Sequence, residues 1–196
     1  MLIEILVLCL ISYLIGSIPF GVLLARAQHV DIRTQGSGNI GATNVARVLG
    51  KKAGLITLLG DLLKGLFVVA GAGQLYEKPI LIALAGIMVF LGHLYSIFLR
   101  FKGGKGVATS LGLFLYIMPW ATGCAVVVFS VSLWISGFVS MSSILAAMSM
   151  PLFAIYFKLP LPYVYLAVIV GLFTLQRHSD NILRLIEGTE SKFFKK

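Results

Sequence analysis

Acidic residues are scarce in this chain of 196 residues, which has only seven Asp and Glu against 16 Lys and Arg, and only three His. No D-x-x-D pair and no H-E-x-x-H segment occurs in the sequence. Metal-dependent lipid transferases and zinc proteases need such sets of ligands. The sequence therefore argues against both classes and predicts no metal site.

Cysteine and charge are also rare. Cys9 and Cys124 both lie inside apolar stretches, so neither a disulfide framework nor a cysteine-based metal site is indicated. Charged residues make up only 12% of the chain and hydrophobic residues 59%, with a mean hydropathy of +0.99. Soluble domains are roughly 45–50% apolar and 25% charged. We therefore predict a polytopic membrane protein without a separate soluble domain.

Six apolar runs are candidates for membrane spans, because a helix of about 20 residues crosses a hydrocarbon core of roughly 30 Å. They cover residues 2–25, 53–73, 80–99, 107–136, 138–157 and 161–175. Most Lys and Arg residues gather in three segments outside these runs. The segments are residues 26–52, 100–105 and 177–196. The positive-inside rule places all three in the cytoplasm.

The run of residues 107–136 is long for one span and has Pro119 near its centre. Since proline interrupts a helix, we interpret this run as two short helices joined at Pro119. The alternative is one long kinked helix, which would leave the basic tail outside. The predicted fold is an all-α, polytopic integral membrane helical bundle of seven transmembrane helices, some of them short. Its N-terminus lies outside and its C-terminus in the cytoplasm, in a single transmembrane domain over residues 1–196.

The first cytoplasmic segment contains GSGNIGATNVARVLG, residues 36–50. Glycines let a backbone fold closely around an anion, and Arg47 offers a planar fork that matches phosphate or carboxylate. GSGNIG also fits the dinucleotide fingerprint G-x-G-x-x-G. However, a polar stretch precedes it instead of a buried strand, and the next acid, Asp61, lies inside an apolar run. We reject a nucleotide site, and a merely flexible loop remains the alternative to a phosphate-binding loop.

The second segment places Gly103-Gly104-Lys105-Gly106 directly before an apolar helical run. The glycine amides and the first helical turn should present N–H groups with partial positive charge, beside the full charge of Lys105. This combination suits a phosphate. The alternative is a basic patch that holds anionic lipid headgroups.

The third segment contains His178 as its second residue; the imidazole of histidine titrates near neutral pH in peptides and suits a general base. Alternatively, His178 merely ends a span. Within the second apolar run, Asp61 and Lys64 are three residues apart and should pair on one helix face. That pair is either a structural contact or a polar wall of the site.

Together, the three segments resemble the three motifs of the bacterial acyl-phosphate:glycerol-3-phosphate acyltransferases, the PlsY family. The resemblance is carried by Ser37 to Arg47, by His93 with Lys105 to Thr109, and by His178 with Asn181, Arg184 and Glu190. Two positions depart from the family pattern. Ser96 stands where proline is usual, which should alter only local backbone stiffness. Ser179 stands where arginine often follows the histidine, which puts one phosphate contact in question.

The resemblance implies transfer of a fatty acyl group from acyl phosphate to the 1-hydroxyl of glycerol 3-phosphate, an early step of bacterial phospholipid biosynthesis. The products would be 1-acylglycerol 3-phosphate, or lysophosphatidate, and phosphate, with no cofactor and no nucleic acid involved. The enzyme would be a multi-pass protein of the bacterial inner membrane with its active site on the cytoplasmic face. The soluble acyl-phosphate synthase becomes a candidate partner.

The resemblance also implies roles for individual residues. The implied catalytic residues are Ser37, Arg47, Lys105 and His178. The implied substrate-binding residues are Gly38, Asn39, Gly41, Thr43, Asn44, His93, Gly103, Gly104, Thr109, Asn181, Arg184 and Glu190. The Gly103 and Gly104 amides would bind phosphate, and Glu190 would order the neighbouring cations.

Acyl phosphate is an activated mixed anhydride, so positioning and charge stabilisation could supply most of the rate without an acyl-enzyme. Either His178 or a phosphate oxygen of the substrate takes the hydroxyl proton, and we favour the substrate oxygen. The rival function is an organic-anion or phosphate transporter. A transporter places its anion site near the middle of the bilayer, whereas these polar residues cluster at one face.

Overall fold

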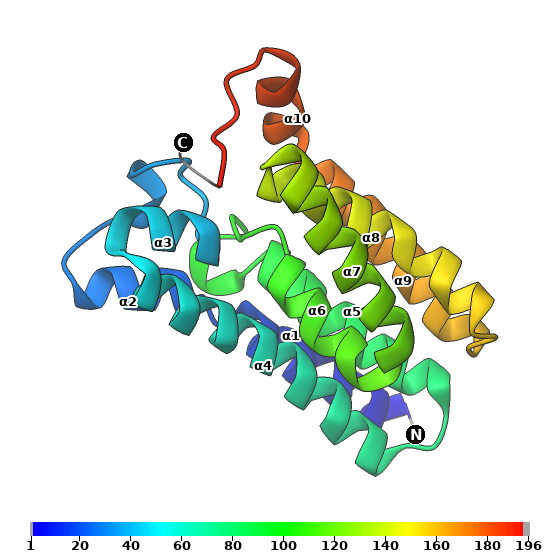
Figure 1. The fold of residues 1–196 in the computed structure, drawn as a ribbon. Coiled ribbons are helices and arrows are strands. Elements are labelled where there is room, and N and C mark those ends of the chain that lie inside the picture. Colours follow the sequence, from blue (N-terminus) through cyan, green and yellow to red (C-terminus); the bar gives the residue numbers. More distant parts are fainter. Residues whose placement is uncertain (1, 194–196) are drawn as a thin grey trace. The chain divides into compact units, whose positions relative to one another are not determined.

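The computed structural model of the protein describes residues 2–193, and all regular secondary structure in that range is helical (Figure 1). This confirms the predicted all-α class. The chain forms two compact units, a first that ends at Tyr116 and a second that begins at Ile117. Each unit is described by itself. The prediction of a single transmembrane domain over residues 1–196 stays a prediction.

Five helical stretches of the described chain are long and apolar enough to cross a membrane. They are Leu2–Ala27, Lys51–Leu75, Pro79–Leu99, Pro119–Ser136 and Val139–Tyr156. Two shorter apolar helices, α6 (Val107–Ile117) and α9 (Leu161–Arg177), accompany them. The run of residues 107–136 is divided at Met118 into α6 and α7 (Pro119–Ser136), as the proline predicted. That all seven segments cross the bilayer, and in which direction, stays a prediction.

In the first unit, α1 (Leu2–Ser17) packs against α5 (Pro79–Leu94), which also packs against α4 (Lys51–Leu75). Glycine permits this close approach, because a Cβ atom on Gly16 or Gly92 would collide with backbone atoms of the facing helix. The helix pair is also joined by a hydrogen bond in which the Tyr13 hydroxyl donates to the Tyr95 carbonyl at 2.6 Å. The first and third candidate spans are therefore held in direct backbone contact.

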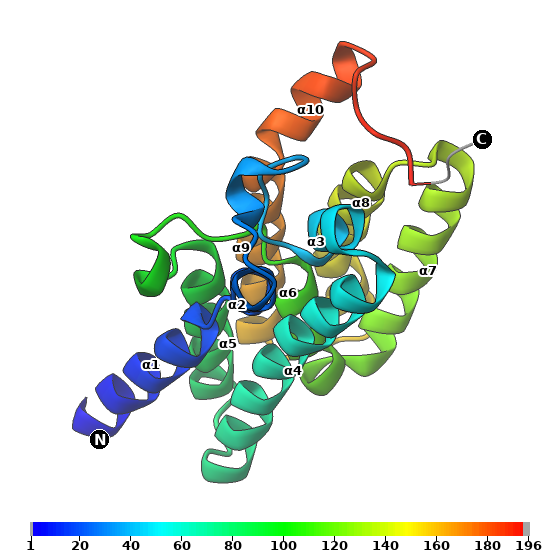
Figure 2. The same ribbon diagram turned by 90° about the vertical axis from the view of Figure 1, so that its left-hand side faces the viewer.

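Shorter elements complete the first unit. The helix is interrupted after α1, and α2 (Phe20–Ala27) follows this interruption. The 3-10 turn η1 (Ile32–Thr34) comes after α2, and the 3-10 turn η2 (Ile97–Leu99) comes after α5. The helix α3 (Ala42–Leu49) lies against α4, as Figure 2 shows. A small core joins these pieces and consists of Val22, Ala25, Ile32, Ile40, Val45, Ala53 and Leu99. This core holds the first and second polar segments together, since Leu99 lies between His93 and Gly103.

The second unit consists of α7, α8 (Val139–Tyr156), α9 and the short α10 (Ser179–Ile186). Helix α8 packs against both α7 and α9. Gly137, with φ of +76°, makes the tight turn between α7 and α8, a conformation that glycine adopts without strain. The chain after α10 returns to this turn, where the Phe193 N–H donates to the Gly137 carbonyl at 2.8 Å.

Candidate functional site

The loop of the first polar segment is fixed by one buried side chain, Asn44. Its Oδ1 accepts from the Ser37 N–H at 2.9 Å. Its Nδ2 donates to the carbonyls of Gln35 at 3.0 Å and Asn39 at 2.9 Å, and lies 3.4 Å from that of Ile32. Only 2% of Asn44 is exposed. What the geometry shows is a loop-building role, and direct contact of Asn44 with a substrate stays a prediction.

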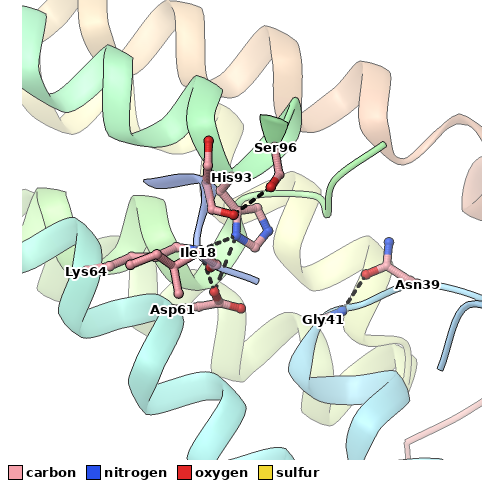
Figure 3. A network of polar contacts seen from close by, with 8 residues as sticks. Ile18, Asn39, Gly41, Asp61, Lys64, His93 and Ser96 are labelled. Atoms are coloured by element: carbon pink, nitrogen blue, oxygen red, sulfur yellow. Dashed lines mark hydrogen bonds and ion pairs between the residues drawn. The ribbon is translucent and has the colours of Figure 1, made fainter. Parts of the chain in front are cut away.

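This loop presents a polar face on α3. Thr43 and Arg47 are both exposed and stand four residues apart, so they share one side of the helix. At the start of α3, the Asn39 Oδ1 accepts from the Gly41 N–H at 2.8 Å (Figure 3). Gly36 and Gly38 have φ of +59° and +71°, the left-handed conformation that favours glycine. Local backbone bonding therefore holds Ser37, Thr43 and Arg47 at the surface of the first unit.

The glycine pair of the second segment is closed onto α5. The Gly103 N–H donates to the Leu94 carbonyl at 3.0 Å, and the Gly104 N–H donates to the His93 carbonyl at 3.1 Å. Both amides are thus bonded to carbonyls at the end of α5 in this structure, and their predicted use as phosphate ligands stays a prediction. Glycine is needed at position 104 for another reason, since a Cβ there would collide with the His93 ring.

Lys105 lies half-buried beside the beginning of α6 at Val107. The first N–H groups of a helix have no partner inside the helix, and they carry partial positive charge. Thr109 is completely buried in this first turn, and its Oγ1 has no hydrogen-bond partner among the described residues. The cationic character predicted for this segment is thus located at Lys105 and the first turn of α6.

A buried charge network lies beneath the glycine loop (Figure 3). The Lys64 ammonium contacts three groups: Asp61 Oδ1 at 2.6 Å, His93 Nδ1 at 2.9 Å and the Ile18 carbonyl at 2.9 Å. An ammonium has three N–H donors and no acceptor. His93 Nδ1 also lies 3.4 Å from Asp61 Oδ1, so this ring nitrogen faces both members of the ion pair. Where Nδ1 accepts from Lys64, the ring proton of neutral His93 lies on Nε2, the atom next to Gly104.

This network confirms the predicted pairing of Asp61 and Lys64 and adds partners that sequence reasoning missed. The signal for the Ile18 contact is Pro19, which interrupts the helix between α1 and α2 and leaves carbonyls beside the break without helical partners. Ser96 uses the same break, because its hydroxyl donates to the Ser17 carbonyl at 2.6 Å. The expectation that serine at position 96 alters only backbone stiffness is therefore wrong: the hydroxyl makes a buried bond that proline cannot make.

The third motif lies in the second unit and is organised by Glu190. This carboxylate accepts from Ser140 Oγ at 2.7 Å, Asn181 Nδ2 at 2.6 Å and Arg184 Nε at 2.7 Å. Burial raises the pKa of Glu190, but the hydrogen bonds from Ser140, Asn181 and Arg184 outweigh it and the net shift is downward. The expected ordering of Arg184 by Glu190 is thus present.

His178 occupies the joint between α9 and α10 and is 3% exposed. Its Nδ1 lies 2.7 Å from the Thr174 carbonyl. A carbonyl only accepts, so Nδ1 carries the proton and Nε2 is the acceptor atom of the neutral ring. The next residue, Ser179, is exposed at the start of α10.

The fold and the polar segments define a class: a helical integral membrane protein that displays cationic and glycine-rich segments suited to phosphate. Comparison with known proteins identifies the family. The sequence model of the family described as glycerol-3-phosphate acyltransferase matches residues 6–188. The chain belongs to this family.

Relatives cover nearly the whole chain. The glycerol-3-phosphate acyltransferase of Geobacter metallireducens is 51% identical over 98% of this chain and 99% of its own length. That of Geobacter sulfurreducens is 47% identical over 96% and 97%, respectively. A crystal structure of PlsY, an integral membrane glycerol 3-phosphate acyltransferase, in its glycerol 3-phosphate form matches with a TM-score of 0.94 and 37% identity, covering 97% of this chain and 96% of that one. Its lysophosphatidic acid form matches with a TM-score of 0.90 and 38% identity over the same shares of the two chains.

Proposed function

We propose that this chain transfers a fatty acyl group from acyl phosphate to the 1-hydroxyl of glycerol 3-phosphate, at the cytoplasmic face of a bacterial inner membrane. The observation that carries the proposal is Arg47 presented at the surface by a loop that Asn44 fixes. Arg47 forms no ion pair with any residue that the structure describes. Family membership, and a similar structure solved in glycerol 3-phosphate and lysophosphatidic acid forms, support the same substrate and product.

In this proposal, cationic and polar side chains bind the phosphate groups of acyl phosphate and glycerol 3-phosphate. Ser37 and Arg47 on the first segment, and Lys105 on the second, bind phosphate oxygens. Thr43 and Asn39 position the glycerol phosphate, as do Asn181 and Arg184, which Glu190 holds in place. The first turn of α6 replaces the Gly103 and Gly104 amides as the source of N–H groups.

The proposed reaction needs no acyl-enzyme. The C1 hydroxyl oxygen of glycerol 3-phosphate attacks the acyl carbonyl carbon, and the bond between that carbon and the bridging phosphate oxygen breaks. Inorganic phosphate leaves with the electron pair, and Arg47 and Lys105 offset its growing charge. The hydroxyl proton passes to a phosphate oxygen of the donor. A soluble synthase of acyl phosphate would supply that donor.

His178 is the second candidate for the base, because its Nδ1–H is held by the Thr174 carbonyl and its Nε2 is then the basic atom. His178→Gln separates the two mechanisms. Substrate assistance predicts a loss well below 10³-fold. A loss above about 10³-fold with substrate binding retained would assign the proton transfer to His178.

The donor is tested with the purified full chain in detergent, labelled glycerol 3-phosphate, and either acyl phosphate or acyl-CoA. We expect labelled lysophosphatidate with acyl phosphate only. Product with acyl-CoA alone would overturn the proposed donor. No product with either donor, together with flux of glycerol 3-phosphate into liposomes, would favour the transporter.

A further inference from the structure

Two contiguous hollows open on the first unit, and no predicted site residue lines either of them. The basic hollow has a volume of about 570 Å³ and is lined by Arg26, Arg33, Phe98, Leu99, Arg100 and Lys102. The apolar hollow has a volume of about 290 Å³ and adds Ile18, Pro19, Val22 and Leu23. Arg26, Phe98 and Leu99 line both. We call the pair the span-end groove.

The position of the groove along the chain sets its depth in the bilayer. Arg26 lies in the last turn of the first candidate span, which ends at Ala27. Arg100 directly follows Leu99, the last residue of the third candidate span. With these two candidate spans across the bilayer, the basic hollow would lie at the level of lipid headgroups, and the apolar hollow, built from span residues around the Pro19 break, would face the acyl chains.

The charge of the groove is strongly positive. Arg33 forms an ion pair with Asp31 at 2.9 Å. The hydrogen bonds from Arg33, helped by the charges of Arg33 and Arg26, lower the pKa of Asp31 to about 2, so this carboxylate stays charged; its ion pair is with Arg33. Arg26, Arg100 and Lys102 make no ion pair with any described residue. Three cations thus remain to receive an anion.

We propose that the span-end groove binds an anionic phospholipid of the surrounding bilayer. The lipid phosphate lies against Arg26, Arg100 and Lys102, and the upper part of an acyl chain lies against Pro19, Leu23 and Phe98. Both halves are needed for this ligand, since a soluble phosphate ester would use only the cations. Phe98, which is 59% exposed, lines both hollows and marks the boundary between them. This inference does not depend on the acyltransferase reaction.

The test is native mass spectrometry of the full chain titrated with phosphatidylglycerol or phosphatidylcholine, which gives the affinity of each lipid. One charge near an anionic lipid contributes about fivefold in affinity. We expect R26Q/R100Q to weaken phosphatidylglycerol binding by roughly tenfold or more and to weaken phosphatidylcholine binding less, because the choline charge of that lipid offsets its phosphate. The matched control K51Q/K52Q removes two exposed lysines of the same unit and should stay within about twofold of the parent chain. If R26Q/R100Q does not fold, R26Q/K102Q makes the same test.

Two further measurements separate a lipid from a soluble anion. Phe98→Ser should weaken the binding of phosphatidylglycerol but not the binding of inorganic phosphate. Excess inorganic phosphate should displace the lipid only weakly. The proposal is overturned if the arginine variants bind phosphatidylglycerol like the parent chain, if K51Q/K52Q loses as much, or if inorganic phosphate displaces the lipid fully.

Discussion

At the scale of single residues, Ser96 has a hydroxyl that makes a hydrogen bond at a position where proline would restrict the backbone. Its donation to the Ser17 carbonyl joins the end of α1 to the segment after α5. Ser96→Ala should lower the free energy of unfolding by about 1–3 kcal/mol, because the buried carbonyl loses its donor. Ser96→Pro should cost less, since φ at this position is −59°, close to the value proline imposes, and the unfolded chain becomes stiffer. Denaturant unfolding in mixed micelles measures both, and a larger loss for proline than for alanine would contradict this account.

Arg47 is the residue on which the proposed chemistry depends most. A charge-assisted contact to phosphate contributes about 1.5–3 kcal/mol, so Arg47→Gln should lower kcat/KM for glycerol 3-phosphate by roughly 10- to 150-fold. The side chain is exposed, so the melting temperature should hardly change. Lys52→Gln, an exposed change nearby, is the control and should keep near-parental activity. Equal losses in the two variants would show only a general effect of charge.

At the scale of elements, the Asp61–Lys64–His93 network joins α4 to α5 and to the break after α1. Both side chains of the ion pair are 3% exposed. Lys64→Met should lower the free energy of unfolding by about 3–5 kcal/mol, because Asp61 is left buried without its partner. Adding Asp61→Asn removes that unpaired charge, so the double variant should be more stable than Lys64→Met. Unfolding in mixed micelles measures these free energies. If the double variant lost as much free energy of unfolding as the two single variants lose together, the coupling would be refuted.

The helix α10 is held by an acid-sensitive contact. The folded-state pKa of Glu190 lies below its ordinary value of 4.5. Ionised Glu190 therefore stabilises the contact with Ser140, Asn181 and Arg184 above about pH 4.5, and this contribution is lost as pH falls through the folded-state pKa. Hydrogen exchange of the α10 amides should accelerate on acidification. Glu190→Gln should exchange faster already at neutral pH and depend less on pH, and unchanged acid sensitivity in that variant would place the effect elsewhere.

At the scale of the whole molecule, a feature could be predicted from the sequence when the residues that form it lie close together along the chain. Long apolar runs predict helices, and Pro119 predicts a break, because both effects are local in the sequence. The all-α class and the division at Met118 were therefore predictable. The Asp61–Lys64 pair was predictable for the same reason, since both lie on one helix. The link from Lys64 to His93 and Ile18 was not, because it depends on which helices pack together.

The partners of the glycine loop were not predictable, for a related reason. Glycine at positions 103 and 104 indicates only that the backbone must approach something closely. The sequence does not say whether that partner is a phosphate or the chain itself, and here it is the carbonyls of His93 and Leu94. The span-end groove was hidden too, since its cations come from segments about 70 residues apart.

The orientation of the protein in the membrane is the last property to test. Helix α7 carries Trp120 near its start and Trp134 near its end, 78% and 81% exposed, as expected for indoles at two membrane interfaces. If α7, α8 and α9 all cross, the turn at Gly137 and the joint at His178 lie on one side and the turn at Lys158 on the other. The basic tail then places His178 in the cytoplasm.

Single-cysteine labelling in intact cells tests this order after Cys9 and Cys124 have been replaced by alanine. A membrane-impermeant maleimide should label a cysteine at position 158 but not at 137 or 179, and all three should be labelled after the cells are opened. The crossing by α6 is the least certain from its length, because its 11 residues rise only about 16 Å. Labelling at 137 but not at 158 would mean that α6 does not change the side of the chain, and the predicted seven-span topology would be wrong.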